Sequence, residues 1–264
     1  MIRSPLMTVM TDAVQKAAKS LRRDFGEVEN LQVSRKGPGD FVTAADRKAE
    51  QVLRDALTKA RPGYGFVLEE GGIIEGPDKT HVWHVDPLDG TTNFMHGQPH
   101  FAISVGLERE GQMVAGVIYD PVKDEMFIAE KGQGAYLNNR RIRVAARRDL
   151  ADSLIGCGIP FVGRGNHPQF LKELAQVMGA TAGVRRAGSA ALDMAYVACG
   201  RLDAYWERYV NSYDIAAGLV LVREAGGFNS NADGGADIFE AGSICCGNEV
   251  LHRALLDLLK KARG

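Results

Sequence analysis

Residues 82–93 read VWHVDPLDGTTN, and this string indicates both a structural element and a chemistry. Its first four residues are typical of a β-strand, because valine and tryptophan favour an extended, half-buried backbone. Two carboxylates, Asp86 and Asp89, follow at the end of that strand. Residues 90–92 (GTT) then offer backbone N–H groups and hydroxyls at the start of a short helix. Carboxylates next to hydrogen-bond donors that could bind a phosphate indicate a site for Mg²⁺-assisted phosphoryl chemistry.

The same string has a purely structural alternative. In that interpretation Asp89 caps the short helix and Asp86 is a turn residue. In the functional interpretation both carboxylates lie on one side of a turn around Pro87, and the main-chain carbonyl of Leu88 is a further oxygen ligand. Three other acidic motifs in the chain favour the functional interpretation.

The first of these motifs is DFVTAAD, residues 40–46. Thr43 followed three residues later by Asp46 resembles a capping box, with aspartate in place of glutamate. A carboxylate on the first turn of a helix is also well placed to accept a proton from a hydroxyl of another segment. Both roles for Asp46 stay open at this point.

The other two motifs place carboxylates at the ends of predicted elements. Glu69 follows a predicted strand and precedes two glycines, which suits either a solvated turn or a site at the strand's end. Asp214 lies seven residues after Glu207 and is also a plausible N-cap residue. Carboxylates that converge without cations repel one another, and oxygen-only ligands favour Mg²⁺, Mn²⁺ or Ca²⁺ over Zn²⁺.

Composition narrows the class of protein. The net charge of −1 argues against nucleic-acid binding as the main activity, because phosphate backbones select for a strong basic excess. The four cysteines have no C-x-x-C spacing and are interpreted as buried, reduced thiols. We find no signal-peptide pattern and no apolar run long enough to cross a membrane. The expectation is a soluble, cytoplasmic protein.

Hydrophobic periodicity divides the chain into two halves. Residues 1–145 contain two predicted helices (6–25 and 43–60), followed by β-rich segments that include an antiparallel hairpin of 101–108 with 113–119. In residues 146–264 strands and helices alternate, which is the α/β pattern. We therefore predict an α+β half and an α/β half that pack firmly, since no flexible linker separates them.

The four motifs, in this order and spacing, resemble those of the inositol monophosphatase family of Mg²⁺-dependent, lithium-inhibited phosphatases. The stretch GSAALDMAYVACG, residues 188–200, is similar to the bacterial inositol-1-monophosphatase branch. The likeness covers nearly the whole chain, most clearly residues 36–227. It implies a layered αβαβα sandwich, a homodimer, two to three Mg²⁺ ions per site (with Mn²⁺ possible) and hydrolysis of small polyol phosphates.

The resemblance also implies a role for each site residue. Glu69, Asp86 and the Leu88 carbonyl would hold a first metal, and Asp86, Asp89 and Asp214 a second, with a third, weaker ion near Glu69. Thr91, hydrogen-bonded to Asp46, would orient and deprotonate the attacking water. The residues implied to contact the phosphate or the rest of the substrate are Gly90, Thr91, Ala190, Glu207 and Asp214.

Alternatives remain within and outside this activity. Related phosphatases act on fructose 1,6-bisphosphate, histidinol phosphate or adenosine 3′,5′-bisphosphate, and a non-catalytic regulatory protein could keep the fold. The ligand set is intact, which argues against the last of these. Arg185 and Arg186 offer an anion contact, although a solvated surface pair is the simpler interpretation. Leu68, Gly71 and Tyr213 depart from the usual family residues without removing a ligand.

Overall fold

The computed structural model describes residues 4–27, 33–37 and 40–263. Helices α1 (Pro5–Phe25) and α2 (Ala44–Ala60) form an outer layer, close to the predicted spans. Both bury one apolar stripe, and α2 ends two residues before Pro62, which cannot continue a helix. The described part of the chain contains no helix with the length and apolar character needed to cross a membrane.

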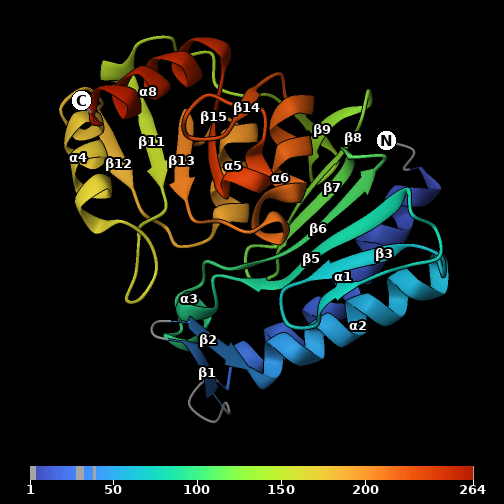
Figure 1. Ribbon diagram of the computed structural model, residues 1–264. Helices are drawn as coiled ribbons and strands as arrows, with labels where there is room; N and C mark the ends of the chain where they lie inside the picture. Colours follow the sequence, from blue (N-terminus) through green and yellow to red (C-terminus); the bar gives the residue numbers. More distant parts are fainter. Residues whose placement is uncertain (1–3, 28–32, 38–39, 264) are drawn as a thin grey trace.

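An eight-stranded sheet lies against α1 and α2 (Figure 1), in the order β10-β9-β8-β7-β6-β5-β3-β4. Strands β3 and β5 are parallel, and the remaining neighbours are antiparallel, including the predicted hairpin of β6 and β7. The strands span β3 (Gly65–Leu68), β4 (Gly72–Ile74), β5 (His81–Asp89), β6 (Ala102–Arg109), β7 (Gln112–Asp120), β8 (Glu125–Glu130), β9 (Gly134–Leu137) and β10 (Arg140–Ile142). Helix α3 (Thr91–Met95) follows β5 directly.

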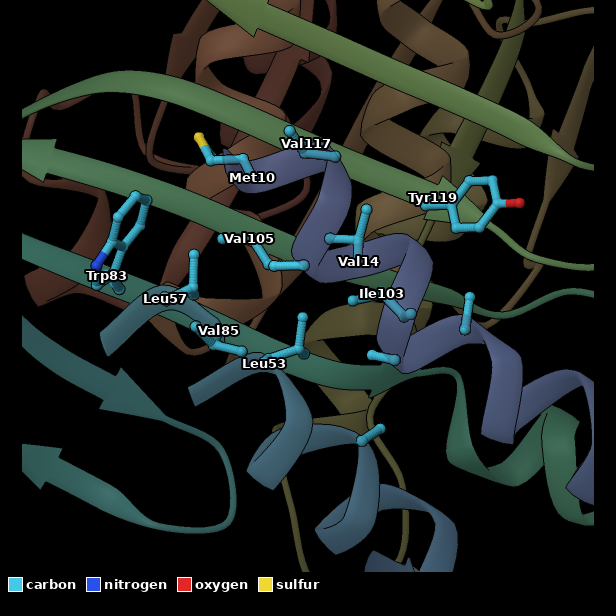
Figure 2. Packing of buried hydrophobic residues seen from close by; sticks show 14 of the residues in the cluster. Met10, Val14, Leu53, Leu57, Trp83, Val85, Ile103, Val105, Val117 and Tyr119 are labelled. Carbon is cyan, nitrogen blue, oxygen red and sulfur yellow. The ribbon is translucent and has the colours of Figure 1, made fainter. Parts of the chain in front are cut away.

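The two faces of this sheet are buried against different helices. Trp83 and Val85 of β5 join the hydrophobic cluster under α1 and α2 (Figure 2). Side chains alternate along a strand, so His84 and Asp86 lie on the opposite face. That face is covered by α6 (Ser212–Glu224), which packs on β5, β6 and β7. Residues 86–89, predicted to bind a metal, thus lie where β5 meets α6.

Two glycines allow α6 to approach the sheet closely. A Cβ at Gly106 of β6 would lie 2.8 Å from the Ala216 Cβ, and one at Gly116 of β7 would lie 2.5 Å from the Ala217 carbonyl oxygen. Any larger side chain would push the helix away from the strands. The start of α6 is therefore held at a fixed depth over β5.

A second sheet of five strands packs on the other side of α5 (Ala190–Ala198) and α6, and its order is β12-β11-β13-β15-β14. Helices α4 (His167–Met178) and α8 (Glu249–Lys261) cover its outer face (Figure 1). The strands are β11 (Leu154–Cys157), β12 (Gly183–Arg185), β13 (Ala204–Arg208), β14 (Phe228–Ser230) and β15 (Ser243–Gly247). The layers run helix, sheet, helix, sheet, helix, and this confirms the predicted αβαβα sandwich.

The structure corrects several details of the sequence interpretation. The second sheet is mixed, because β15 runs antiparallel to both β13 and β14. The polar, glycine-rich segment near residue 37 contains a hairpin, β1 (Val33–Gly37) with β2 (Asp40–Thr43), while residues 38–39 lie outside the described ones. Two short elements, a 3₁₀ helix (Leu150–Asp152) and α7 (Ile238–Ala241), were not expected. One hydrophobic cluster combines residues from both halves of the chain, such as Phe127 and Leu219.

Candidate active site

A cleft of about 370 Å³ opens between the end of β5 and the second sheet. Most of the predicted site residues line it: Glu69, Asp89, Gly90, Thr91, Ala190, Glu207 and Asp214. Three others, Asp46, Asp86 and Leu88, are buried and at most 2% exposed. The structure therefore gathers residues from β5, α3, α5, β13 and α6 around one cavity.

The end of β5 has an irregular local geometry. The pairing of β5 with β6 is interrupted between Asp86 and Asp89, which lets the strand turn. Asp86 Oδ1 accepts a hydrogen bond from the Leu88 N–H at 2.9 Å and stabilises that turn. Glu69 follows β3, and its N–H donates to the Val85 carbonyl at 3.2 Å, so it lies beside Asp86 on the neighbouring strand. The side chains of Glu69 and Asp86 share a hydrogen bond.

Asp89 and Asp214 are each oriented by the start of a helix. Asp89 Oδ2 accepts from the Ser189 hydroxyl at 2.5 Å and from the Ala191 N–H at 2.7 Å, at the N-terminus of α5. Asp214 Oδ2 accepts from the Asn211 N–H at 2.7 Å, at the N-terminus of α6. Asp89 does not cap α3, whose N-cap residue is Gly90 with a positive φ of 96°. In both carboxylates these bonds occupy one oxygen only, Oδ2.

Asp46 caps a helix and also accepts a hydrogen bond from a hydroxyl of another segment. Its Oδ2 accepts from the Thr43 N–H at 2.8 Å and from the Thr43 hydroxyl, which completes the capping box of α2. Its Oδ1 accepts from the Thr91 hydroxyl at 3.1 Å, and that hydroxyl also lies 3.0 Å from the Leu88 carbonyl oxygen. A threonine hydroxyl lining the cleft is thus joined to a buried carboxylate behind it.

The carboxylates around the cleft hold their protons more tightly than usual. Burial and then the neighbouring Glu69 charge raise the pKa of Asp86 well above its ordinary value. Burial raises the pKa of Asp89 to about 7, against the hydrogen bond from Ser189. Burial and the Asp89 charge raise the pKa of Asp214 to about 7. In Asp214, the charge of Arg164, which also lines the cleft, opposes these effects without cancelling them.

The donor set fits a hard divalent cation. It consists of four carboxylates and a main-chain carbonyl, with no nitrogen or sulfur ligand, and a cation would relieve the repulsion among the carboxylates. In the conformations described, no three acidic, histidine or cysteine side chains of residues 4–27, 33–37 and 40–263 are drawn together tightly enough to hold a metal. Asp89 and Asp214 instead accept hydrogen bonds at the N-termini of α5 and α6.

The raised pKa values predict how stability depends on pH without metal. Carboxyl groups of the unfolded chain titrate at about pH 4, whereas Asp89 and Asp214 of the folded chain titrate at about pH 7. Between these two pH values the folded chain binds more protons than the unfolded chain. The free energy of unfolding therefore falls as the pH rises through this range. We expect the metal-free protein to melt at least ~4 °C lower at about pH 8 than at about pH 5.5.

Thermal melts in EDTA and in excess Mg²⁺ check this expectation. Bound cations stabilise the ionised carboxylates of the folded chain, so Mg²⁺ should remove most of the difference between the two pH values. A metal-free protein that melts at the same temperature or higher at the alkaline pH would contradict the pKa directions given above.

Glu207 lies on β13, opposite the cluster of metal-ligand candidates. It accepts a hydrogen bond from the Tyr205 hydroxyl, and burial raises its pKa to about 7. Gly158 gives Glu207 its room, because a Cβ there would lie 1.9 Å from the Glu207 Cδ. The carboxylate is thus held by a tyrosine and lines the cleft.

Sequence reasoning missed several residues that line the cleft. Asp193 on α5 is 2% exposed, and Arg164 lies in a loop too generic in sequence to interpret. Asp193 could have been found from its helical spacing to Ser189. Arg186 also lines the cleft, whereas the exposed Arg185 donates to the Val184 carbonyl, so the two arginines have different surroundings.

Comparisons with known proteins agree with this geometry. The model of the inositol monophosphatase family matches residues 3–263. An inositol-1-monophosphatase of Mesorhizobium japonicum is 60% identical over 99% of this chain and 98% of its own length. A Nus factor SuhB of Pseudomonas aeruginosa is 42% identical over 97% of this chain and 96% of its own. The crystal structure of extragenic suppressor protein suhB from Bartonella henselae superposes with a TM-score of 0.95 at 53% identity, covering 98% of this chain and 99% of that one.

Proposed function

The chain belongs to the inositol monophosphatase family, and from this premise we propose that it hydrolyses inositol monophosphates to inositol and phosphate with the help of Mg²⁺. The observation that carries the proposal is the cleft itself, in which Glu69, Asp89 and Asp214 surround the buried end of β5. Intact carboxylates favour catalysis over a purely regulatory role.

We propose that Glu69, Asp86 and the Leu88 carbonyl hold one ion and that Asp86, Asp89 and Asp214 hold a second. Divalent cations bound there supply the positive charge that phosphoryl transfer requires and lower the pKa of water. Asp86 is central in this assignment because it is the most buried of the four carboxylates. Mn²⁺ has the same preference for oxygen ligands and should substitute.

The chain's own residues position and deprotonate the nucleophile. The Thr91 hydroxyl gives its hydrogen to Asp46 Oδ1, so its oxygen is oriented to accept a hydrogen from water in the cleft. A proton leaving that water passes through Thr91 Oγ1 to Asp46 Oδ1. Burial raises the pKa of Asp46, which makes this carboxylate a better acceptor than an exposed one. Gly90 and Thr91 line the cleft where we place the phosphate.

The substrate's hydroxyls are assigned to the opposite wall. Glu207 accepts from Tyr205 and stays aimed at the cleft, and Ala190 lines the same wall at the start of α5. A carboxylate that accepts hydrogen bonds from two vicinal hydroxyls recognises a polyol. A second phosphate next to Glu207 would be repelled, and this favours a monophosphate over a bisphosphate.

Replacing Glu207 with glutamine tests the polyol assignment. We expect kcat/KM for inositol 1-phosphate to fall about 10–100-fold, because charge-assisted hydrogen bonds are worth roughly 1.5–3 kcal/mol. Hydrolysis of p-nitrophenyl phosphate, which has no hydroxyls to bind, should change little. Steady-state kinetics on both substrates make the comparison.

The matched control is Glu240→Gln, since Glu240 is an exposed residue of α7 and does not line the cleft. It should leave both substrates unaffected. Equal losses on both substrates in Glu207→Gln would mean that Glu207 supports the metal site or the fold, and the polyol assignment would be wrong.

Two further expectations belong to the proposal. We propose a homodimer, which light scattering on the purified protein measures directly.

We also propose a reducing, cytoplasmic location, because all four cysteines are free and none is placed to form a disulfide. Burial raises the pKa of the Cys157 thiol to about 12, so this cysteine is inert rather than reactive.

A further inference from the structure

A partly buried series of hydrogen bonds, centred on the buried His84, connects the strand and the helix that carry the metal-ligand candidates. His84 Nδ1 lies 2.9 Å from the Ser212 hydroxyl oxygen, and His84 Nε2 lies 3.1 Å from Glu108 Oε2. His84 is 4% exposed, and its ring packs against Phe239 with centroids 5.3 Å apart. None of these residues takes part in the chemistry assigned above.

The direction of the hydrogen bond between His84 and Glu108 follows from the groups involved. The hydrogen bond from His84 lowers the pKa of Glu108, so this carboxylate is ionised and can only accept. His84 Nε2 therefore carries a hydrogen and donates it to Glu108. Nδ1 is hydrogen-bonded to the Ser212 hydroxyl, which can either donate or accept. The ring is fixed at both nitrogens.

The position of this series of hydrogen bonds relates it to the metal site. His84 and Asp86 are two residues apart on β5 and share the face that α6 covers. Ser212 is the first residue of α6, and Asp214 lies two residues further along the same turn. The Asn211 N–H orients the Asp214 carboxylate, so moving the start of α6 moves that carboxylate relative to Asp86.

We propose that Ser212, His84 and Glu108 are positioning residues that fix the first turn of α6 on β5 and thereby set the affinity of the Asp86–Asp214 pair for a divalent cation. This inference rests on the proposed function, since it requires that the two carboxylates share an ion. The bond between Ser212 and His84 joins residues 128 positions apart, from α6 and β5, whereas Glu108 lies on β6, the strand that pairs with β5. Partners outside the ligand set commonly change metal affinity when they are removed.

Serine, histidine and glutamate are also the residue types of some hydrolase catalytic triads. Ser212 does not line the cleft, and Phe239 covers the His84 ring. The hydroxyl therefore lacks the substrate access that a nucleophile requires, and the positioning role fits the geometry better.

The test measures Mn²⁺ binding to the full chain, without substrate, from the electron paramagnetic resonance signal of the free ion. Ser212→Ala and His84→Phe should each raise the Kd for Mn²⁺ about tenfold. The double variant should bind Mn²⁺ no more weakly than the weaker-binding single variant, because both changes break the same series of hydrogen bonds. Ser212→Thr keeps the hydroxyl and should bind like the unchanged protein. Glu108→Gln keeps an acceptor for His84 and should bind more tightly than Glu108→Ala.

A second serine–histidine hydrogen bond of this protein, between Ser230 and His252, provides a matched control. The Ser230 hydroxyl oxygen, on β14 of the second sheet, lies 2.9 Å from His252 Nε2 on α8, and both residues are outside the cleft. Ser230→Ala loses the same kind of hydrogen bond, so it should lower the melting temperature as Ser212→Ala does but leave the Kd for Mn²⁺ unchanged.

The outcomes separate this inference from the proposed function. If Asp214→Asn weakens Mn²⁺ binding but Ser212→Ala binds as tightly as the unchanged protein, the positioning role is wrong and the metal site stands. If the unchanged protein binds no Mn²⁺, or Asp214→Asn does not affect binding, the metal assignment itself is wrong, and the inference falls with it.

Discussion

Asp86→Asn should lower kcat by at least about 1,000-fold, because this carboxylate is assigned to both metal ions and their charge is worth several kcal/mol to the transition state. The fold should survive the change. The amide oxygen of asparagine can still accept the hydrogen bond from the Leu88 N–H that Asp86 Oδ1 accepts now. Removing a buried, repelled carboxylate should even raise the melting temperature of the metal-free protein at neutral pH.

Asp120→Asn is the matched control for this variant. Asp120 also ends a strand, and its Oδ1 accepts from the Val122 N–H at 2.9 Å, but it lies outside the cleft and pairs with Lys123. We expect it to lower the melting temperature and to leave kcat close to that of the unchanged protein. Full activity in Asp86→Asn would contradict its assignment as a metal ligand.

Thr91→Ala should lower kcat by at least ~10²-fold with a smaller effect on KM, because its hydroxyl orients the nucleophile in the transition state. Asp46→Asn should behave similarly. The double variant should be little worse than either single variant, since the two groups act through one hydrogen bond. Thr91→Ser, which keeps the hydroxyl, should retain much of the activity.

Thr43→Ala separates catalysis from helix capping. Thr43 Oγ1 accepts from the Ala45 N–H at 3.1 Å, so this variant should lose about 1 kcal/mol of stability with a smaller loss of activity. Thermal melts and steady-state kinetics on the same preparations are compared. If Asp46→Asn lowered stability as Thr43→Ala does and kept its activity, Asp46 would be a cap and nothing more.

Local signals explain which parts of the fold were predictable. Helices α1 and α2 have long apolar stripes and recognisable ends, and the β6–β7 hairpin has an obvious turn at residues 109–112. The β1–β2 hairpin was missed because its residues are polar and lack alternation. The antiparallel direction of β15 was not predictable, since it depends on pairing with β13, a strand far away in sequence.

Most of the site residues that the sequence predicted line the cleft, whereas their contacts could not be predicted. The spacing of Asp86 and Asp89 identified two carboxylates at a strand end, and the structure places Asp89 in the cleft with Asp86 buried behind it. The hydrogen bond from Ser189 to Asp89 joins residues 100 positions apart, so only tertiary packing creates it. The same holds for the bond between Ser212 and His84, which lie 128 positions apart.

Release of phosphate from inositol 1-phosphate, measured on the metal-stripped protein with and without Mg²⁺, tests the central claim most directly. We predict no release in excess EDTA, full recovery when Mg²⁺ is added in excess of the chelator, and inhibition by millimolar Li⁺, as the family resemblance implies. Arg164 and Arg186 also line the cleft, but divalent cations held by the carboxylates are assigned the charge that phosphoryl transfer requires. Full activity in excess EDTA would contradict the account.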